Sequence, residues 1–547
     1  MRRALRAVLV TVCAIGGALL VGTVRPRAIS ADADQDDNDQ RVSRVLLVSI
    51  DGMHAADFAN CMTGLPGVNS GRPYCPALAA LAEHGLNYPQ ASASKPSDSF
   101  PGILAMTTGG SPRTTGVFYD VSYDRKLSPP NAVAPSACPS TEGTQVIFDE
   151  SIDRDLTKLN AGGGIDTDAL PRDGANACAP VYPHTFLRVN TIFEVVRAAG
   201  GYTAWSDKHP AYEILNGPSG TGVLDLYTPE IQSTPVPLPQ IPGCSPLPDQ
   251  TAVTTDDDWT TSFENIKCYD SLKVQAVINE INGRSHDGLS AKPVPRMFGM
   301  NFQAVSVGQK LKEHKTDPGG YLDSLGTPSN HLLGEIMFVD GAIGRMVEAL
   351  RTRGLLDSTL IVISAKHGQS PVDPKRLLRI DFDDPSSIAP SDLLGGIGPT
   401  NPLAQAIEDD VSLMWLNNQQ NTEAFVDQLE ANEARIGGGK IFSGNALRLM
   451  FGDPLEDSRT PDIIVAPNVG VVYTGKNKKI AEHGGFAHDD TNVMLLVSNP
   501  RLRARTIISP VETAQIAPTI LEALGLDGRE LMAVRLEGTT PLPGVLR

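Results

Sequence analysis

Short, continuous apolar runs alternate along this chain with segments whose apolar residues recur at helical spacing. Arg44–Ile50 (RVLLVSI) and Thr359–Ser364 (TLIVIS) are typical of strands that are buried on both faces. Glu335–Leu350 carries apolar side chains three and four residues apart and is followed by Gly354, as an amphipathic helix often is. Strands that alternate with helices form a mostly parallel sheet with helices on both faces. We therefore predict a doubly wound α/β fold.

Weaker strand-like and helix-like patterns predict the remaining elements of the core. The predicted strands are 297–305, 462–466 and 493–498, and the predicted helices are 75–83, 99–109, 191–199, 422–436 and 512–524. Residues 120–291 are rich in Pro, Gly, Asp and Thr, which favours a loop-rich, disulfide-stapled insertion over the active face. A second variable region spans 369–459. We predict that 34–547 form one catalytic domain that includes both segments.

The charge of the chain limits its partners. The formal net charge of the 547 residues is −17 at pH 7. Such a charge argues against a nucleic-acid duplex or an anionic membrane surface as the main partner. A small phosphate ester remains a possible substrate, because the local field in a site governs its binding. The oligomeric state is left open.

The N-terminus has the three parts of a signal peptide. Arg2, Arg3 and Arg6 precede the apolar run Ala7–Val24, and the small-residue stretch Ala31–Ala33 offers a cleavage site. We predict that 1–33 are a signal peptide and that the mature protein is secreted or extracytoplasmic. The alternative is a signal anchor that stays in the membrane, since the run is near the lower length limit for a span. No second segment is long and apolar enough, so we expect no stable membrane insertion after cleavage.

The cysteine pattern also favours export. One cysteine, Cys13, lies in the leader, and six remain after it, an even number that suggests disulfides in an exported chain. Sequential pairing is the simplest of the possible connectivities, although the sequence cannot select it. It would join Cys61 to Cys75, Cys138 to Cys178 and Cys244 to Cys268.

Four reactive side chains follow apolar runs or lie in short loops. They are Asp51, Ser99 in KPSDSFPG, His367, and His483 in AEHGGF. Ligands of open α/β sheets bind at the carboxyl ends of the strands, so we expect these side chains to gather there. A carboxylate, a hydroxyl and two imidazoles together predict a metal-assisted hydrolase. Each also has a plainer explanation, namely a turn Asp, a helix-capping Ser, and structural or surface histidines.

The order of these motifs resembles a known family. Asp-Gly at 51–52, Ser-Phe-Pro at 99–101, Ala-Lys-His-Gly at 365–368 and Glu-His-Gly-Gly at 482–485 are similar to the type I phosphodiesterase/nucleotide pyrophosphatase branch of the alkaline phosphatase superfamily. Thr460–Ile463 and Thr513–Gly525 are also similar to that branch, and the resemblance covers 44–116 and 296–543. It implies an alkaline phosphatase fold, Ser99 as a covalent nucleophile, and two zinc ions.

The resemblance further implies six zinc ligands, and three of the matching positions lack ligand chemistry. Asp51 and His367 match one zinc site, and His483 matches the other. The remaining matches are Lys366 in the first site and Val305 and Gln309 in the second. A protonated Lys cannot bind a metal, Val has no donor atom, and Gln is a weak neutral ligand. We therefore expect at most one divalent metal ion per chain, zinc, held by the first three residues.

Lys366 is expected to supply the positive charge that a metal ion would otherwise provide. A buried ammonium group beside the nucleophile can clamp phosphoryl oxygens, although the same substitution can also inactivate the site. Gln309 and Asn301 are assigned to substrate binding. Two loop segments, 207–209 (DKH) and 488–490 (HDD), offer replacement ligands, although charged residues in loops are usually solvated.

We expect an exported hydrolase that cleaves a phosphodiester or a pyrophosphate through a covalent Ser99 intermediate at this altered metal site. One alternative is a sulfatase or phosphonate hydrolase of the same superfamily. Another is a non-catalytic exported protein that holds an anionic ligand in the same pocket.

Overall fold

The computed structural model of the chain describes residues 42–546 except for 140–142, 237, 239, 243, 245–257, 314–315, 382–383, 385, 396–401 and 475–478. The predicted signal peptide therefore lies outside the described residues. Within them, no helix has both the length and the apolar character that crossing a membrane requires.

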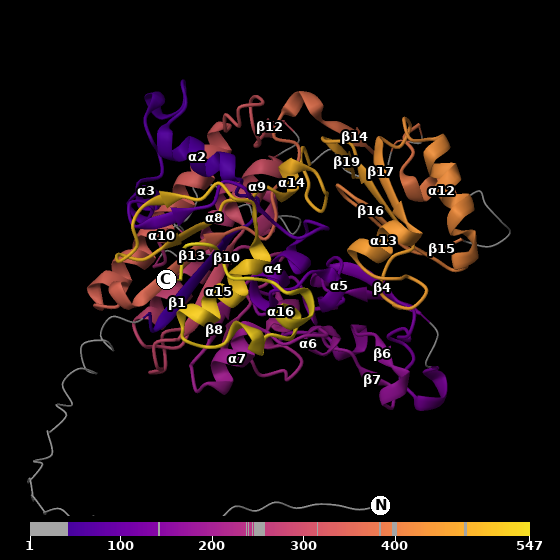
Figure 1. Ribbon diagram of the computed structural model, residues 1–547, viewed down its shortest axis with the longest axis horizontal. Helices are drawn as coiled ribbons and strands as arrows, with labels where there is room; N and C mark the ends of the chain where they lie inside the picture. The colour runs from indigo at the N-terminus through magenta and orange to yellow at the C-terminus, as the bar shows by residue number, and fades with distance from the viewer. Residues whose placement is uncertain are drawn as a thin grey trace, which may run out of the picture. The chain divides into compact units, whose positions relative to one another are not determined.

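An eight-stranded sheet with the order β21-β2-β20-β13-β1-β10-β8-β9 forms the centre of the fold (Figure 1). Its strands are β1 (Arg44–Ile50), β2 (Gly85–Asn87), β8 (Ala204–Ser206), β9 (Asp225–Tyr227), β10 (Met297–Phe302), β13 (Thr359–Ser364), β20 (Leu496–Ser498) and β21 (Arg505–Thr506). β1 pairs in parallel with both β10 and β13, whereas β20 is antiparallel to its neighbours β13 and β2. The prediction of a mostly parallel sheet is confirmed.

The two central predicted strands are buried along nearly their whole length. Residues 45–50 of β1 and all six residues of β13 are buried. Each fully buried Val, Leu or Ile side chain contributes roughly 1.5–3 kcal/mol relative to an exposed one. Because both faces of these strands are apolar, the sheet requires a helical layer on each side.

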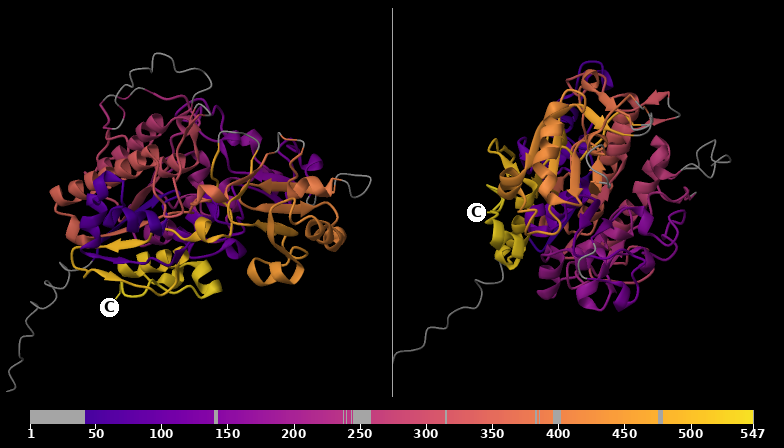
Figure 2. Two further views of the ribbon diagram at one scale, coloured as in Figure 1. Left: turned by 90° about the horizontal axis from the view of Figure 1, so that it is seen from above. Right: turned by 90° about the vertical axis from the view of Figure 1, so that its right-hand side faces the viewer.

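Two groups of helices supply these layers. α3 (Pro76–Ala82), α8 (Phe263–Ile281) and α10 (Asn330–Thr352) pack together, with α10 in contact with both of the others. α4 (Ser99–Thr108), α7 (Ile192–Ala198) and α15 (Ile516–Ala523) form the second group. The sheet runs between the two groups in two perpendicular views (Figures 1 and 2). The doubly wound architecture is therefore confirmed.

The segment 120–291 contributes more regular structure than its composition predicts. The predicted helix at 191–199 is present as α7, but the 19-residue α8 was not expected, and β8 and β9 extend the central sheet. α8 buries Asp270 and Lys273 as an ion pair with 3.0 Å between carboxylate and ammonium. In a sequence, charged residues that pair inside a protein look like those of a solvent-exposed helix face. The buried side of α8 therefore cannot be predicted from the sequence.

The variable region after β13 builds a separate sheet. β15 (Leu403–Glu408), β16 (Ser412–Leu416), β18 (Ile463–Pro467) and β17 (Gly438–Ser443) pair in that order, all antiparallel. α12 (Thr422–Ala431) packs against β17 and ends before the predicted residue 436.

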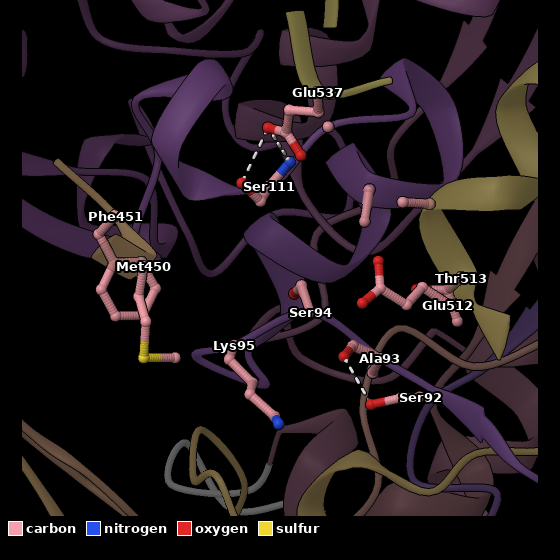
Figure 3. A pocket seen from close by; sticks show the side chains of 13 residues that line it. Ser92, Ala93, Ser94, Lys95, Ser111, Met450, Phe451, Glu512, Thr513 and Glu537 are labelled. Carbon is pink, nitrogen blue, oxygen red and sulfur yellow. Dashed lines mark hydrogen bonds between the residues drawn. The ribbon is translucent and has the colours of Figure 1, made fainter. Parts of the chain in front are cut away.

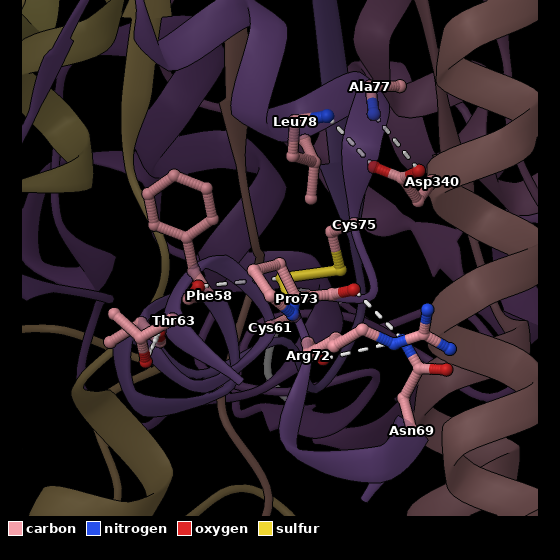
Figure 4. The surroundings of a disulfide bond; sticks show 11 residues. Phe58, Cys61, Thr63, Asn69, Arg72, Pro73, Cys75, Ala77, Leu78 and Asp340 are labelled. Atoms are coloured by element: carbon pink, nitrogen blue, oxygen red, sulfur yellow. Dashed lines mark hydrogen bonds between the residues drawn. A yellow bond between two sulfur atoms is a disulfide. The ribbon is translucent and has the colours of Figure 1, made fainter. Parts of the chain in front are cut away.

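Two of the three predicted disulfides are present. Cys61–Cys75 joins α2 (Ala55–Thr63) to the start of α3, where Asp340 accepts hydrogen bonds from the backbone N–H groups of Ala77 and Leu78 (Figure 4). The second disulfide joins Cys244 to Cys268, which lies within α8. The predicted third bond is wrong for this structure, because Cys138 and Cys178 are free buried thiols that lie together against Ala132.

Candidate active site

Polar side chains gather where four adjacent parallel strands end. Asp51 follows β1, Lys366 and His367 follow β13, and Asn301 lies near the end of β10. Ser49 of β1 is level with Asn301 on one side and with Ser364 on the other, so these ends lie at the same height. β8, which continues the parallel set beyond β10, ends directly before Asp207. This is the edge at which α/β sheets bind ligands.

Ser99 is the first residue of α4, and it is not the helix cap that the sequence suggested. The cap is Asp98, whose side chain accepts a hydrogen bond from Phe100 N at 3.0 Å. The Ser99 hydroxyl is therefore available for other contacts. Its Oγ lies 3.3 Å from His367 Nε2 and 3.3 Å from Lys208 Nζ.

Gly102 brings α4 close enough for these contacts. A Cβ atom at this position would lie 2.2 Å from the carbonyl oxygen of Lys366. Any larger residue would push the helix off the end of β13. The glycine one turn after Ser99 therefore sets the distance between Ser99 and His367.

The His367 ring is held by the backbone of the next residue. Its Nδ1 lies 2.8 Å from the carbonyl oxygen of Gly368. Because a carbonyl only accepts, we assign the ring proton to Nδ1, which leaves a lone pair on Nε2. Nε2 faces the Ser99 hydroxyl and lies 3.7 Å from Asp51 Oδ2.

One oxygen of Asp51 is surrounded by nitrogen atoms. Oδ2 accepts hydrogen bonds from Asn301 Nδ2 at 3.1 Å and from Gln303 Nε2 at 2.5 Å, and Lys366 Nζ lies 3.8 Å away. Burial alone would raise the pKa of Asp51, but the neighbouring Lys366 ammonium group and the His367 imidazole outweigh it and hold the pKa well below its ordinary value. Asp51 is therefore a fixed anion.

Lys366 forms a buried ion pair with the insertion. Its ammonium group donates to Asp207 Oδ1 at 3.0 Å and to the Tyr212 hydroxyl at 2.9 Å, and it is fully buried. Burial lowers the pKa of Lys366, and the carboxylates of Asp207 and Asp51 oppose that shift. A lysine between two carboxylates keeps its charge far more readily than an isolated buried one.

Lys208 brings a second cation to Ser99, and the sequence marks it only as part of a loop cluster. Burial would lower the pKa of Lys208, but the carboxylates of Asp51 and Glu150 outweigh it and raise the pKa. Its side chain is partly exposed, whereas Ser99 is 2% exposed. Lys208 therefore lies on the solvent side of Ser99.

His483 completes the group from a loop before α14 (His488–Thr491). Its ring centre lies 3.9 Å from that of His367, and its Nδ1 lies 3.6 Å from Asp98 Oδ1. Burial, together with the neighbouring His367 and Lys310 side chains, holds the pKa of His483 well below its ordinary value. Gly484 has a φ of +107°, and a Cβ there would lie 2.2 Å from the Tyr119 hydroxyl, so the tight loop requires glycine.

The two residues assigned to substrate binding use their amide groups inside the protein. Gln309, in α9 (Ala304–Lys310), donates to Gly52 O and to the Tyr321 hydroxyl, both at 2.8 Å. Asn301 donates to Asp51. Their role toward a substrate stays a prediction.

The other loop cluster has structural roles. Asp489 accepts a hydrogen bond from Val372 N at 2.9 Å, and Asp490 accepts one from Ala487 N at 3.2 Å. Neither forms a hydrogen bond or ion pair with Ser99, Asp51 or His367 that the structure records for the described residues.

The residues present do not fit a two-zinc centre. At the position that the resemblance assigns to a carboxylate of the first site, Lys366 carries an ammonium group, and Val305 is a fully buried apolar residue at the start of α9. In the part of the chain that the structure describes, no group of three or more His, Cys, Asp or Glu side chains is arranged to hold a metal ion. The expectation of at most one metal ion per chain remains a prediction.

A cavity of about 240 Å³ lies elsewhere on α4 (Figure 3). Lys95, Ser111, Phe451 and Glu537 are among the residues that line it, and none of the residues that contact Ser99 is among them. The chemistry of the site therefore has no connection with this cavity.

Comparisons with known proteins identify the family of the chain. A family model for type I phosphodiesterase/nucleotide pyrophosphatase matches residues 45–144 and 314–489, together just over half of the 547 residues. No curated protein matches the chain. Asp51, Ser99, His367 and His483 lie in the matched segments, whereas Lys208 does not.

Solved structures with low sequence identity share the fold. Wild-type alkaline phosphatase PafA is 13% identical with a TM-score of 0.57, and the match covers 93% of this chain and 99% of that one. Murine ectonucleotide pyrophosphatase/phosphodiesterase 5 is 12% identical with a TM-score of 0.52, covering 89% and 96%. The chain therefore belongs to the type I phosphodiesterase/nucleotide pyrophosphatase family and is a hydrolase of that kind.

Proposed function

We propose that the protein cleaves phosphodiesters or pyrophosphates through a covalent intermediate on Ser99. The observation that carries this proposal is the position of Ser99 Oγ, 3.3 Å from an imidazole nitrogen and 3.3 Å from an ammonium nitrogen. A hydroxyl between a proton acceptor and a cation is suited to attack on an anionic phosphorus centre.

Lysine side chains supply the positive charge. Asp98 already accepts the hydrogen bond from Phe100 N, and Pro101 has no N–H. The N-terminus of α4 therefore has few free N–H groups with which to bind an anion. Two unit charges 4 Å apart attract each other by about 4 kcal/mol at an effective dielectric of 20. Lys208, on the solvent side of Ser99, is placed to bind a phosphoryl oxygen. Lys366, 3.8 Å from Asp51 Oδ2, adds further positive charge to the site.

We further propose that the protein is exported and holds at most one divalent metal ion per chain. The two disulfides fit an oxidising compartment. Mass spectrometry of the secreted protein should find an N-terminus near Asp32 or Asp34, and intact Met1 would contradict cleavage.

A substrate screen tests the hydrolase proposal. Wild-type protein should cleave bis(p-nitrophenyl) phosphate faster than p-nitrophenyl phosphate, and p-nitrophenyl sulfate and a phosphonate ester should be poorer still. Preferred cleavage of the sulfate or the phosphonate would identify the other hydrolase type. Binding of inorganic phosphate without turnover of any ester would identify an anion-binding protein.

A further inference from the structure

One oxygen of Asp51, Oδ2, is surrounded by protein nitrogen atoms, whereas Oδ1 has no hydrogen-bond partner among the described residues. Asp51 Oδ2 has the amide groups of Asn301 and Gln303 as donors, and Lys366 Nζ and His367 Nε2 lie 3.8 and 3.7 Å from the same atom. Gln309 donates its Nε2 to Gly52 O and to the Tyr321 hydroxyl, and its Oε1 is at most a weak neutral ligand. The Lys366 ammonium group, 3.8 Å from Asp51 Oδ2, repels a divalent cation, so these residues disfavour a metal ion at Asp51.

His367 has a different contact available. With the proton on Nδ1 held by Gly368 O, the lone pair of Nε2 is directed at the Ser99 hydroxyl. Both side chains are at most 2% exposed, so bulk water does not compete for this contact. A serine hydroxyl beside an imidazole of fixed tautomer is the arrangement of nucleophile and base.

We propose that His367 is the general base for Ser99 and that the two lysines replace metal ions, so that hydrolysis runs without a bound metal. This inference rests on the proposed function of the site and names the groups that carry it out.

Ser99 and His367 exchange one proton during the reaction. In the first step Ser99 Oγ passes its proton to His367 Nε2 and forms a bond to phosphorus, and the leaving-group oxygen departs with the electron pair of its own P–O bond. In the second step water attacks phosphorus, and Ser99 Oγ leaves and takes the proton back from the imidazolium. The proton of the attacking water passes to solvent and neutralises the departed oxyanion.

The surrounding residues hold this pair in place. Asp207 and Tyr212 fix the ammonium group of Lys366, and Asp51 lies between Lys366 and His367, where its negative charge stabilises the imidazolium of the first step. Lys208 Nζ lies close enough to Ser99 Oγ to contact an oxygen of the bound phosphoryl group.

Turnover by metal-stripped wild-type protein is the primary test. The protein is dialysed against a chelator, its metal content is measured by mass spectrometry, and cleavage of bis(p-nitrophenyl) phosphate is followed with and without added zinc. We expect the stripped protein, with well under one metal ion per chain, to keep its full rate. A rate that is lost on stripping and restored by zinc would overturn this inference and leave the proposed function standing. No turnover in either state would remove both.

Chemical rescue provides a second, independent readout. His367→Ala should lower kcat by roughly 10²–10⁴-fold, the usual contribution of a general base. Free imidazole should restore part of that loss in the stripped protein. His286→Ala is the matched control, because His286 pairs with Asp225, which begins β9, and lies apart from Ser99. Rescue of folded His367→Ala by zinc but not by imidazole would contradict the assignment.

Discussion

The Lys366 ammonium group lies 3.0 Å from Asp207 Oδ1, so one buried ion pair joins the end of β13 to the chain that follows β8. Both side chains are fully buried. Breaking a buried pair by removing one partner typically costs 3–5 kcal/mol, because the remaining charge is left without compensation. The charge of the site and the anchoring of the insertion therefore depend on the same contact.

Ser99→Ala should abolish turnover while the fold stays intact. The variant removes the attacking oxygen and leaves the helix cap, which belongs to Asp98. Ser97→Ala is the matched control and should have a mild effect, since the Ser97 hydroxyl donates to the carbonyl oxygen of Asp490 and not to the site. Steady-state kinetics and circular dichroism of both variants check this, and a wild-type rate in Ser99→Ala would refute the covalent mechanism.

Lys366→Ala should lower kcat by ~10²-fold or more, even with excess zinc, if the ammonium group stabilises the transition state. It should also lower the unfolding free energy, because Asp207 loses its partner. Lys375→Ala changes an exposed lysine nine residues further on and serves as the control for loss of charge. Rates are compared at equal folded fraction, and full activity in folded Lys366→Ala would show that the alignment of this position is wrong.

The mature protein should contain two free thiols. Cys138 and Cys178 are unbonded, and the other four cysteines form the two disulfides. Thiol titration of the denatured, unreduced protein measures this number, and a value of zero would mean that the third predicted bond forms in solution. Cys75→Ser opens a loop with a sequence separation of 14 and should cost roughly 3 kcal/mol of stability in denaturant unfolding.

Glu335→Gln should stabilise the protein at alkaline pH. Burial raises the pKa of Glu335 to about 9 from the ordinary 4.5, and neither carboxylate oxygen has a hydrogen-bond partner among the described residues. Between these two values the native state binds more protons than the unfolded state, so stability falls as pH rises, by at most ~1.4 kcal/mol per pH unit. Glutamine does not titrate and removes this loss.

The gain from Glu335→Gln should therefore be absent below pH 4.5 and largest near pH 9. Urea unfolding at a series of pH values measures it. Glu348→Gln on the same helix is the control, because Glu348 is an exposed partner of Arg351 and its neutralisation should change stability little. Equal pH profiles for wild type and Glu335→Gln would contradict the buried-acid explanation.

The parts of the site that the sequence predicts are those that follow long strands. β1 and β13 are continuous apolar runs, and a residue just after such a run is placed by local pattern alone, which is why the sequence places Asp51 and His367 at the ends of these strands. Ser99 was found through its motif, although the cap is its neighbour Asp98.

Lys208 could not be assigned in the same way. β8 has only three residues, too few to show a strand pattern, and it reaches the sheet through pairing with β10, which lies about ninety residues further along the chain. That Asp207 pairs with Lys366 depends on this long-range pairing. Side chains brought together by distant segments become visible only when the sheet order is known.

Because Gly102 lies against the Lys366 carbonyl oxygen, the position of Ser99 and the charge at position 366 are set independently. The helix that carries Ser99 rests on main-chain atoms, which are the same whatever side chain position 366 bears. The chemistry at that position can therefore be exchanged, from a carboxylate to an ammonium group, without displacing the serine. In such a protein, single substitutions can change the charge around the Ser99 oxygen while the backbone that positions this oxygen stays the same.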